Sequence, residues 1–351
     1  MLSLLQKLSV IPDIYKGRFI DMDREINLAY QKYPFPWPSE KQYDRYSLED
    51  ILAKKRESET LFKEFMRDFH VDEGFFAGKA VLDLGAGVGW DAIVVASAGA
   101  KSVCAVDNSL TSVEHGRRFA QQLNLSNVHM IRSSLYDIGR LELSPDVIIA
   151  KGVLHHVFDL PRLAGAIRRL VKPGTELLVT HSRYSTRLGF YKYFNNHLAW
   201  VLGGADIEKR IDAGIRLFRG WTRKFPPEVI RDRTNDLAGV FYMARSARKI
   251  KKIFEDQGFK VETVPNNTYL DYYPSLGTKL QDMIKNTRSG RIKKAVFVVM
   301  LMKLRFFSIL AARCAMLNRG LGHLFTVLFF MPPHKLKMVA LGDRRGDTPQ
   351  R

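Results

Sequence analysis

The 351-residue sequence contains only two cysteines and no uninterrupted apolar run of 18 residues. Cys104 and Cys314 offer neither a disulfide framework nor the spacing of a metal site, which favours a reducing compartment. The apolar stretches are shorter than a membrane-spanning helix requires. The N-terminus also lacks the long apolar core and the cleavage site of a secretory signal. We therefore expect a cytoplasmic protein, with attachment to the inner face of a membrane as the alternative.

Two kinds of functional motif are missing as well. The sequence has no G-x-x-x-x-G-K-[ST] element, which excludes a P-loop. Its nine histidines do not cluster with carboxylates at ligand spacing, so we expect no metal site.

Positive charge is in excess, with a formal net charge of +19. The excess falls mainly in residues 182–250 and 279–351, whereas the first 180 residues are close to neutral. A basic surface of this kind favours phospholipid headgroups, nucleic acid or an acidic substrate as a partner. A solvated basic face without a partner is the alternative.

The most specific motif is the run VLDLGAGVG at residues 81–89. It predicts a buried strand, a turn of alternating glycines, and a helix that begins near Trp90. Glycines let the backbone approach a ligand closely, and the start of a helix supplies free N–H groups. Asp107 ends a second apolar run, residues 102–106, so its carboxylate should accept hydrogen bonds from ribose hydroxyls. Together these features predict a nucleoside-binding site.

The identity of the nucleoside follows from spacing and from further segments. Trp90 occupies the place of the third glycine of a dinucleotide motif. The D-x-G-x-G-x-G spacing is followed in order by PDVIIAKGVLHHV at 145–157 and LVKPGTELLV at 170–179. Over residues 75–265 the sequence resembles the class I S-adenosylmethionine (SAM)-dependent methyltransferases. A Rossmann-like domain that binds another ligand is the alternative.

The resemblance implies an α/β fold with a Rossmann-like, seven-stranded, mostly parallel sheet and an antiparallel last strand. Apolar runs and turn signals place the elements. We expect strands near 80–84, 102–106, 127–131, 146–150, 175–180, 258–264 and 336–341. We expect helices near 47–69 (with Ser47 as its cap), 90–98, 110–123, 160–171 and 247–257.

The chain divides into successive regions. They are a helical N-terminal cap at 1–70, a SAM-binding core at 71–265 with a substrate-side insertion at 182–250, a basic apolar helical insertion at 266–334, a final core strand at 335–343, and a tail at 344–351. Within the second insertion, residues 288–331 alternate apolar stretches with basic residues. This pattern fits a helical hairpin at an anionic membrane surface, a cover over the sheet or the substrate cavity, or a protein-partner surface.

The resemblance also implies the roles of the cofactor-binding residues. The loop of Gly85, Ala86, Gly87 and Gly89 should wrap the methionine and ribose portions of SAM, and Asp83 should anchor the loop and the amino group. Asp107 should bind the ribose, with Asn108 beside the adenine. Ser134 takes the place of an acid that often contacts the adenine, next to Leu135. Lys151 should direct its ammonium away from the sulfonium or toward the SAM carboxylate.

Three histidines are candidates near the methyl acceptor: His155, His156 and His181. Histidine titrates near neutral pH and can accept a proton from a hydroxyl. Adjacent side chains diverge, so we expect at most one of the first two to face the substrate; shaping the pocket is the alternative role. Aromatic residues of the N-terminal region could cover the site or simply pack: Tyr33, Phe35, Trp37, Tyr43 and Tyr46.

These features predict a SAM-dependent methyltransferase that acts on a small or lipid-like metabolite, either at a membrane surface or away from one. A tRNA or rRNA methyltransferase is one alternative, because the basic charge suits phosphate contacts. A SAM-binding protein without catalysis is another. The oligomeric state stays open.

Overall fold

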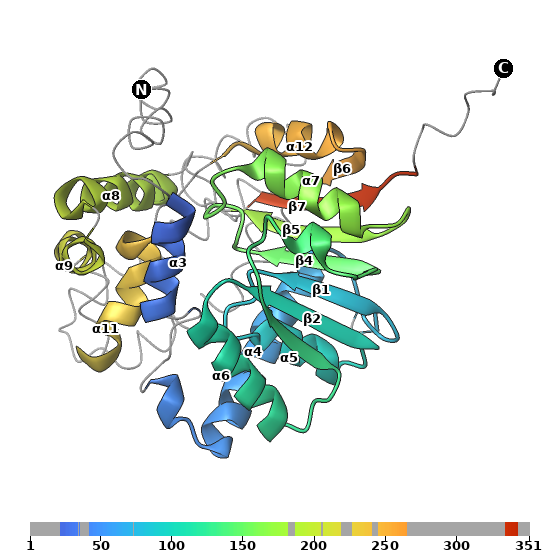
Figure 1. Cartoon of the computed structure of the whole chain (residues 1–351), viewed down its shortest axis with the longest axis horizontal. Helices are drawn as coiled ribbons and strands as arrows, with labels where there is room; N and C mark the ends of the chain where they lie inside the picture. The colour runs from blue at the N-terminus through green and yellow to red at the C-terminus, as the bar shows by residue number, and fades with distance from the viewer. Residues whose placement is uncertain are drawn as a thin grey trace, which may run out of the picture.

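A computed structural model of the chain describes residues 22–33, 35, 42–72, 74–181, 187–204, 206–218, 227–240, 245–264 and 334–342. Its centre is a seven-stranded sheet with the order β3-β2-β1-β4-β5-β7-β6 (Figure 1). The strands are β1 (Ala80–Leu84), β2 (Ser102–Asp107), β3 (Val128–Arg132), β4 (Val147–Lys151), β5 (Glu176–His181), β6 (Phe259–Thr263) and β7 (His334–Ala340). Each lies within a residue or two of its predicted place.

Strand directions confirm the predicted fold class. The pairs from β3 through β5 are parallel, and β7 runs antiparallel to both β5 and β6. Strands β1 and β4 are buried along almost their whole length because helices cover both faces of the sheet. This double cover explains why their sequences are continuous apolar runs rather than alternating patterns.

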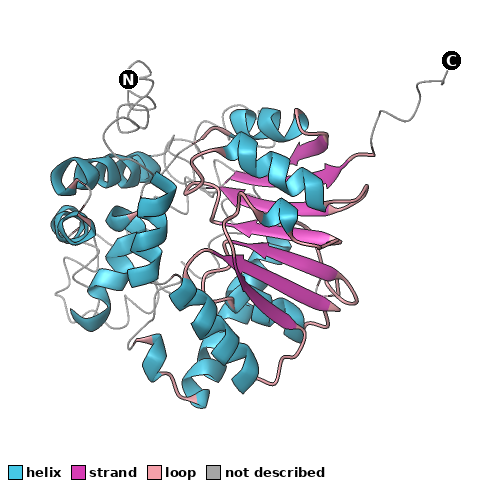
Figure 2. Ribbon diagram, in the orientation of Figure 1, coloured by secondary structure: helices cyan, strands magenta, loops and turns pink. Residues whose placement is uncertain are grey.

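Helices form a layer on each side of the sheet (Figure 2). The core helices are α4 (Leu48–Asp68), α5 (Trp90–Ser97), α6 (Leu110–Gln122), α7 (Leu160–Leu170) and α12 (Ala247–Glu255). One hydrophobic cluster joins the sheet to α7 and α12, and a second joins the opposite face to α4 and α5. Helix α4 begins at Ser47 as predicted, with a capping box in which the Ser47 hydroxyl accepts a hydrogen bond from the Asp50 amide.

A separate group of helices lies beside the sheet, on the left in Figure 1. It contains α3 (Met22–Lys32), α8 (Arg187–Gly203), α9 (Ile207–Leu217), α11 (Pro227–Thr234) and the π-helix η3 (Asn235–Gly239). Arg210 of α9 is fully buried in this group, 3.3 Å from the Glu25 carboxylate and 3.8 Å from the Trp200 ring centre. The N-terminal region and the 182–250 insertion therefore pack together.

The predicted apolar insertion at 266–334 lies outside the described residues, apart from the start of β7. Among the described helices, none has the length and apolar content needed to cross a bilayer.

Candidate cofactor and acceptor site

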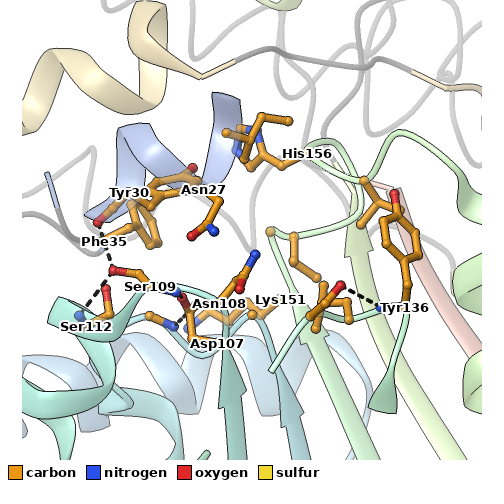
Figure 3. Close-up of a pocket in the computed structure, with 18 residues that line it drawn as sticks. Asn27, Tyr30, Phe35, Asp107, Asn108, Ser109, Ser112, Tyr136, Lys151 and His156 are labelled. Atoms are coloured by element: carbon orange, nitrogen blue, oxygen red, sulfur yellow. Dashed lines mark hydrogen bonds between the residues drawn. The ribbon is translucent and has the colours of Figure 1, made fainter. Parts of the chain in front are cut away.

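A pocket lies between the carboxyl ends of β1 to β4 and the helix α3 (Figure 3). Its volume is about 870 Å³, counted with the space at its open mouth. Most of the predicted site residues line it: Gly85, Gly87, Asp107, Asn108, Ser134, Leu135, Lys151 and His156. Of the other candidates whose side chains the structure describes, Asp83, Ala86, Gly89 and His155 are not among the lining residues.

The glycine turn after β1 has the left-handed backbone that its sequence predicts. Gly85, Gly87 and Gly89 have φ values of 66°, 57° and 78°, a region in which side chains other than glycine are strained. At Gly85 the space is also closed, because a Cβ there would lie 2.4 Å from Cγ2 of Val153. Glycine is thus required at Gly85 by a protein contact, in addition to any close approach of a ligand.

Asp107 is oriented by two backbone amides. Its Oδ2 accepts a hydrogen bond from the Gly87 amide and its Oδ1 from the Ser109 amide, each at 2.8 Å. Burial raises the pKa of Asp107, and the amides of Ser109 and Gly87 oppose that rise. Each carboxylate oxygen can accept a further hydrogen bond, so this geometry suits a pair of ribose hydroxyls.

Asp83 is a buried acid with an unsatisfied oxygen. The residue is 3% exposed, and its Oδ2 has no hydrogen-bond partner. Burial raises the pKa of Asp83 well above its usual range; the charges of Asp91 and Asp107 add to the rise and that of Lys151 opposes it. A buried acceptor without a donor is costly. Since Asp83 does not line the pocket, a bridging water is what would connect this oxygen to a ligand ammonium above the glycine turn.

Lys151, at the end of β4, is turned toward α5. Its Nζ lies 3.0 Å from Oδ1 of Asp91 and 5.6 Å from the ring centres of Phe62 and Phe65 in α4. The lysine nevertheless lines the pocket, with 31% of its side chain exposed.

The segment after β3 carries a serine where the family resemblance would place an acid. Ser134 lies where that acid is expected, and its Oγ accepts a hydrogen bond from the Tyr136 amide at 3.3 Å. Leu135 and Tyr136 continue the same wall. A hydroxyl acceptor is weaker here than a carboxylate would be.

Of the three candidate histidines, His156 is the one whose side chain the structure places in the pocket wall. Its ring meets Tyr30 edge to face at a centroid distance of 5.7 Å and lies 4.0 Å from the ring of His155. Both histidines are buried. The side chain of His181 lies outside the described part of the chain, although its backbone pairs with that of His334.

The loop that carries His156 is held by Arg245, which the sequence reasoning did not single out. The buried guanidinium donates hydrogen bonds to the carbonyls of Leu154, Val157 and Phe158 at 3.0, 2.7 and 2.7 Å. Burial lowers the pKa of Arg245 to about 10. Because these partners lie 87 to 91 residues away in the sequence, no local pattern indicates the contact.

Helix α3 forms the roof of the pocket, which the sequence did not predict in detail. Ile26, Asn27 and Tyr30 line the site, and Figure 3 shows Asn27 and Tyr30 above it. Near the end of the helix, the hydroxyls of Ser109 and Thr111 donate to the Tyr30 and Gln31 carbonyls, each at 2.9 Å. The apolar spacing of Ile26, Ala29 and Tyr30 on one helix face is the signal that could have indicated a packed helix.

For two of the N-terminal aromatic residues the structure shows packing, which was the alternative to a cover over the site. Tyr43 and Tyr46 pack in a buried cluster with Trp90 and Phe119, because η1 (Tyr43–Arg45) docks on α6 rather than over the pocket. The Tyr33 hydroxyl donates to Glu208 of α9 at 2.8 Å. Phe35 does line the pocket, and Trp37 lies outside the described residues.

Comparison with known proteins agrees with this arrangement. A family model described as a methyltransferase domain matches residues 75–258, slightly more than half of the chain. The chain belongs to this family, within the class I SAM-dependent methyltransferases, and SAM is its cofactor.

Individual similarities are more distant. A 76-residue stretch is 38% identical to the polyketide synthase-nonribosomal peptide synthetase ACE1 of Pyricularia oryzae; it is 22% of this chain and spans only 2% of that protein. The YcgJ protein from Bacillus subtilis is 14% identical, with a TM-score of 0.42 over 82% of this chain and 99% of that one. Magnesium protoporphyrin IX methyltransferase (ChlM) from Synechocystis PCC 6803, solved with bound S-adenosylhomocysteine (SAH), is 17% identical, with a TM-score of 0.39 over 75% and 94%.

Proposed function

We propose that this protein methylates a small or lipid-like metabolite that enters the pocket beneath α3. The observation that carries the proposal is the apolar and aromatic lining of the pocket beneath α3. Ile26, Tyr30 and Phe35 line the pocket together with Val153 and Val157 of the loop after β4. These side chains are apolar or aromatic and would exclude water from a modest molecule. A folded RNA would need a more open approach to the same place.

The nucleoside portion of SAM would be bound by residues at the carboxyl ends of β2 and β3. Asp107 would accept hydrogen bonds from the ribose hydroxyls, while Asn108, Ser134 and Leu135 border the adenine. The turn at Gly85 and Gly87 would pass close to the methionine portion. When bound, SAM supplies the methyl group of its sulfonium. The leaving group is a neutral thioether, which needs no proton donor. The protein's contribution is then mainly alignment of donor and acceptor.

On the acceptor side, His156 is the group we assign to proton removal. Its ring lies in the pocket wall against Tyr30, and an uncharged imidazole can take a proton from a hydroxyl or an ammonium. The three carbonyl contacts of Arg245 fix the loop on which His156 stands. His156→Gln is expected to lower the methylation rate about 10²-fold or more if the acceptor loses a proton in the reaction. His129→Gln, an exposed change on β3, serves as the control.

The substrate class is tested by incubating the protein with methyl-labelled SAM and a cell extract, then separating polar metabolites, lipids and RNA. Label in a metabolite or lipid fraction supports the proposal, and label confined to tRNA or rRNA rejects it. Asp107→Ala should abolish SAH binding in calorimetry, whereas the exposed change Asp256→Ala should not. Normal SAH affinity in Asp107→Ala would contradict the site.

We further propose a peripheral position at an anionic membrane, on the basis of the sequence of residues 288–331. The support is the alternation of apolar stretches with lysine and arginine. Sedimentation with vesicles containing an anionic phospholipid should be lost when residues 292–332 are removed. Unchanged sedimentation of the shortened protein would reject the idea.

A further inference from the structure

Lys151 brings a positive charge into the wall of the pocket. Of the described residues that line it, Lys151 is the only lysine or arginine. Its ammonium lies against Asp91 and beside two phenylalanine rings, yet the side chain is partly exposed to the pocket. The positive charge of Lys151 therefore lies in the same region as the buried acid Asp83.

The strand register puts opposite charges side by side. Asp83 of β1 pairs with Ile149 of β4, and Lys151 follows Ile149 by two residues. Side chains two residues apart in a strand point to the same face of the sheet. Asp83 and Lys151 thus share the face that α4 and α5 cover, at the carboxyl edge where the glycine turn begins. An acid and a base on adjacent strand ends match the ammonium and carboxylate of an amino acid.

We propose that Lys151 binds the carboxylate at the methionine end of the cofactor, and that Asp91 holds the lysine ready while the pocket is free. The inference rests on the proposed SAM site and adds a specific residue to it. Binding moves Lys151 from one carboxylate to another, so its charge stays paired throughout. Asp91 can release the lysine because it lies in the first turn of α5, where backbone amides and the helix dipole stabilise a negative charge.

The test compares two ligands that differ in one group. SAH carries the carboxylate, and decarboxylated SAH keeps the ammonium and the adenosine but lacks it. Calorimetry on the full chain should show that Lys151→Met weakens SAH about tenfold or more, as expected for loss of a charge-assisted hydrogen bond. Decarboxylated SAH should lose less than about threefold, because it has no group for the lysine to bind. Lys151→Arg should retain most of the SAH affinity.

Two further variants separate this role from a structural ion pair. Lys172→Met makes the same change in charge at the opposite edge of the sheet, where Lys172 lies 2.7 Å from Asp146, and should leave both affinities unchanged. Asp91→Asn should tighten SAH binding, since the lysine no longer has to leave a partner. If Lys151 only ties β4 to α5, Asp91→Asn and Lys151→Met should weaken SAH equally.

The outcomes distinguish the inference from the function on which it rests. If the unaltered protein binds neither ligand, the SAM site is wrong. If it binds SAH but Lys151→Met weakens both ligands equally, or neither, the assignment of Lys151 is overturned. Should Lys151→Met fail to fold, Asp91→Asn still decides the matter, because it must tighten the binding of SAH and leave that of decarboxylated SAH unchanged.

Discussion

Replacing Gly85 with alanine tests why the turn after β1 needs glycine. Two costs are expected at this position. The backbone has a φ of 66°, and a left-handed conformation costs a residue with a Cβ about 1–2 kcal/mol. The new Cβ would also lie 2.4 Å from Val153 Cγ2, and relieving such a contact in a packed region costs about 1–3 kcal/mol. Gly85→Ala should therefore lower the free energy of unfolding by about 2–5 kcal/mol.

Gly78 provides a matched control for the backbone cost alone. Its φ is 70°, and a Cβ there would meet no atom within 4 Å. Gly78→Ala should lower the free energy of unfolding by only about 1–2 kcal/mol. Adding Val153→Ala to Gly85→Ala should recover part of the difference, because the contacting methyl is removed. Urea denaturation of the four proteins measures these values. Equal losses for Gly78→Ala and Gly85→Ala would refute the steric argument.

The remaining predictions concern buried charges. Burial raises the pKa of Asp232 to about 6, so the folded state binds the proton of this carboxyl more tightly than the unfolded state does. The free energy of unfolding should therefore fall as the pH rises from about 4 through 6. Asp232→Asn should flatten this dependence when denaturation is measured across that range. Arg245→Met leaves three buried carbonyls without their donor and should cost about 3 kcal/mol or more, with faster amide exchange at residues 154–158. Burial raises the pKa of Asp83, and the ammonium of SAH should lower it again, so SAH binding should release protons at a pH between the pKa values of the free and the bound protein. Calorimetry in buffers of different ionisation enthalpy should detect that release, and Asp83→Asn should abolish it.

The sheet was predictable because its sequence signals are local. Residues 80–84 and 102–107 are short apolar runs that end at a glycine turn and an acid, and burial on both faces dictates that pattern. The nucleoside half of the pocket follows directly, since the carboxyl ends of adjacent parallel strands meet at one edge. Gly85, Gly87 and Asp107 all line one pocket in the structure, and their contacts with SAM stay a prediction.

The acceptor half was not predictable in the same way. Tyr30 and Tyr43 are both tyrosines in a polar N-terminal region, yet one lines the pocket and the other packs against α6. Aromatic composition indicates burial but not the partner. The direction of Lys151 likewise depends on Asp91 and on rings of α4, which belong to other parts of the chain.

Ser109 makes three hydrogen bonds and connects the loop after β2 with helix α3. Its amide donates to Asp107 at 2.8 Å, its hydroxyl donates to the Tyr30 carbonyl at 2.9 Å, and the same hydroxyl caps α6 by accepting from the Ser112 amide at 3.2 Å. The residue that orients the Asp107 carboxylate, which we propose binds the ribose, therefore also holds the end of α3. Together with the hydrogen bond from the Thr111 hydroxyl to the Gln31 carbonyl, this contact fixes the end of α3 to the segment that follows β2. The segment after β2 thus helps to set the position of a helix that is distant in the sequence, and with it the shape of the pocket.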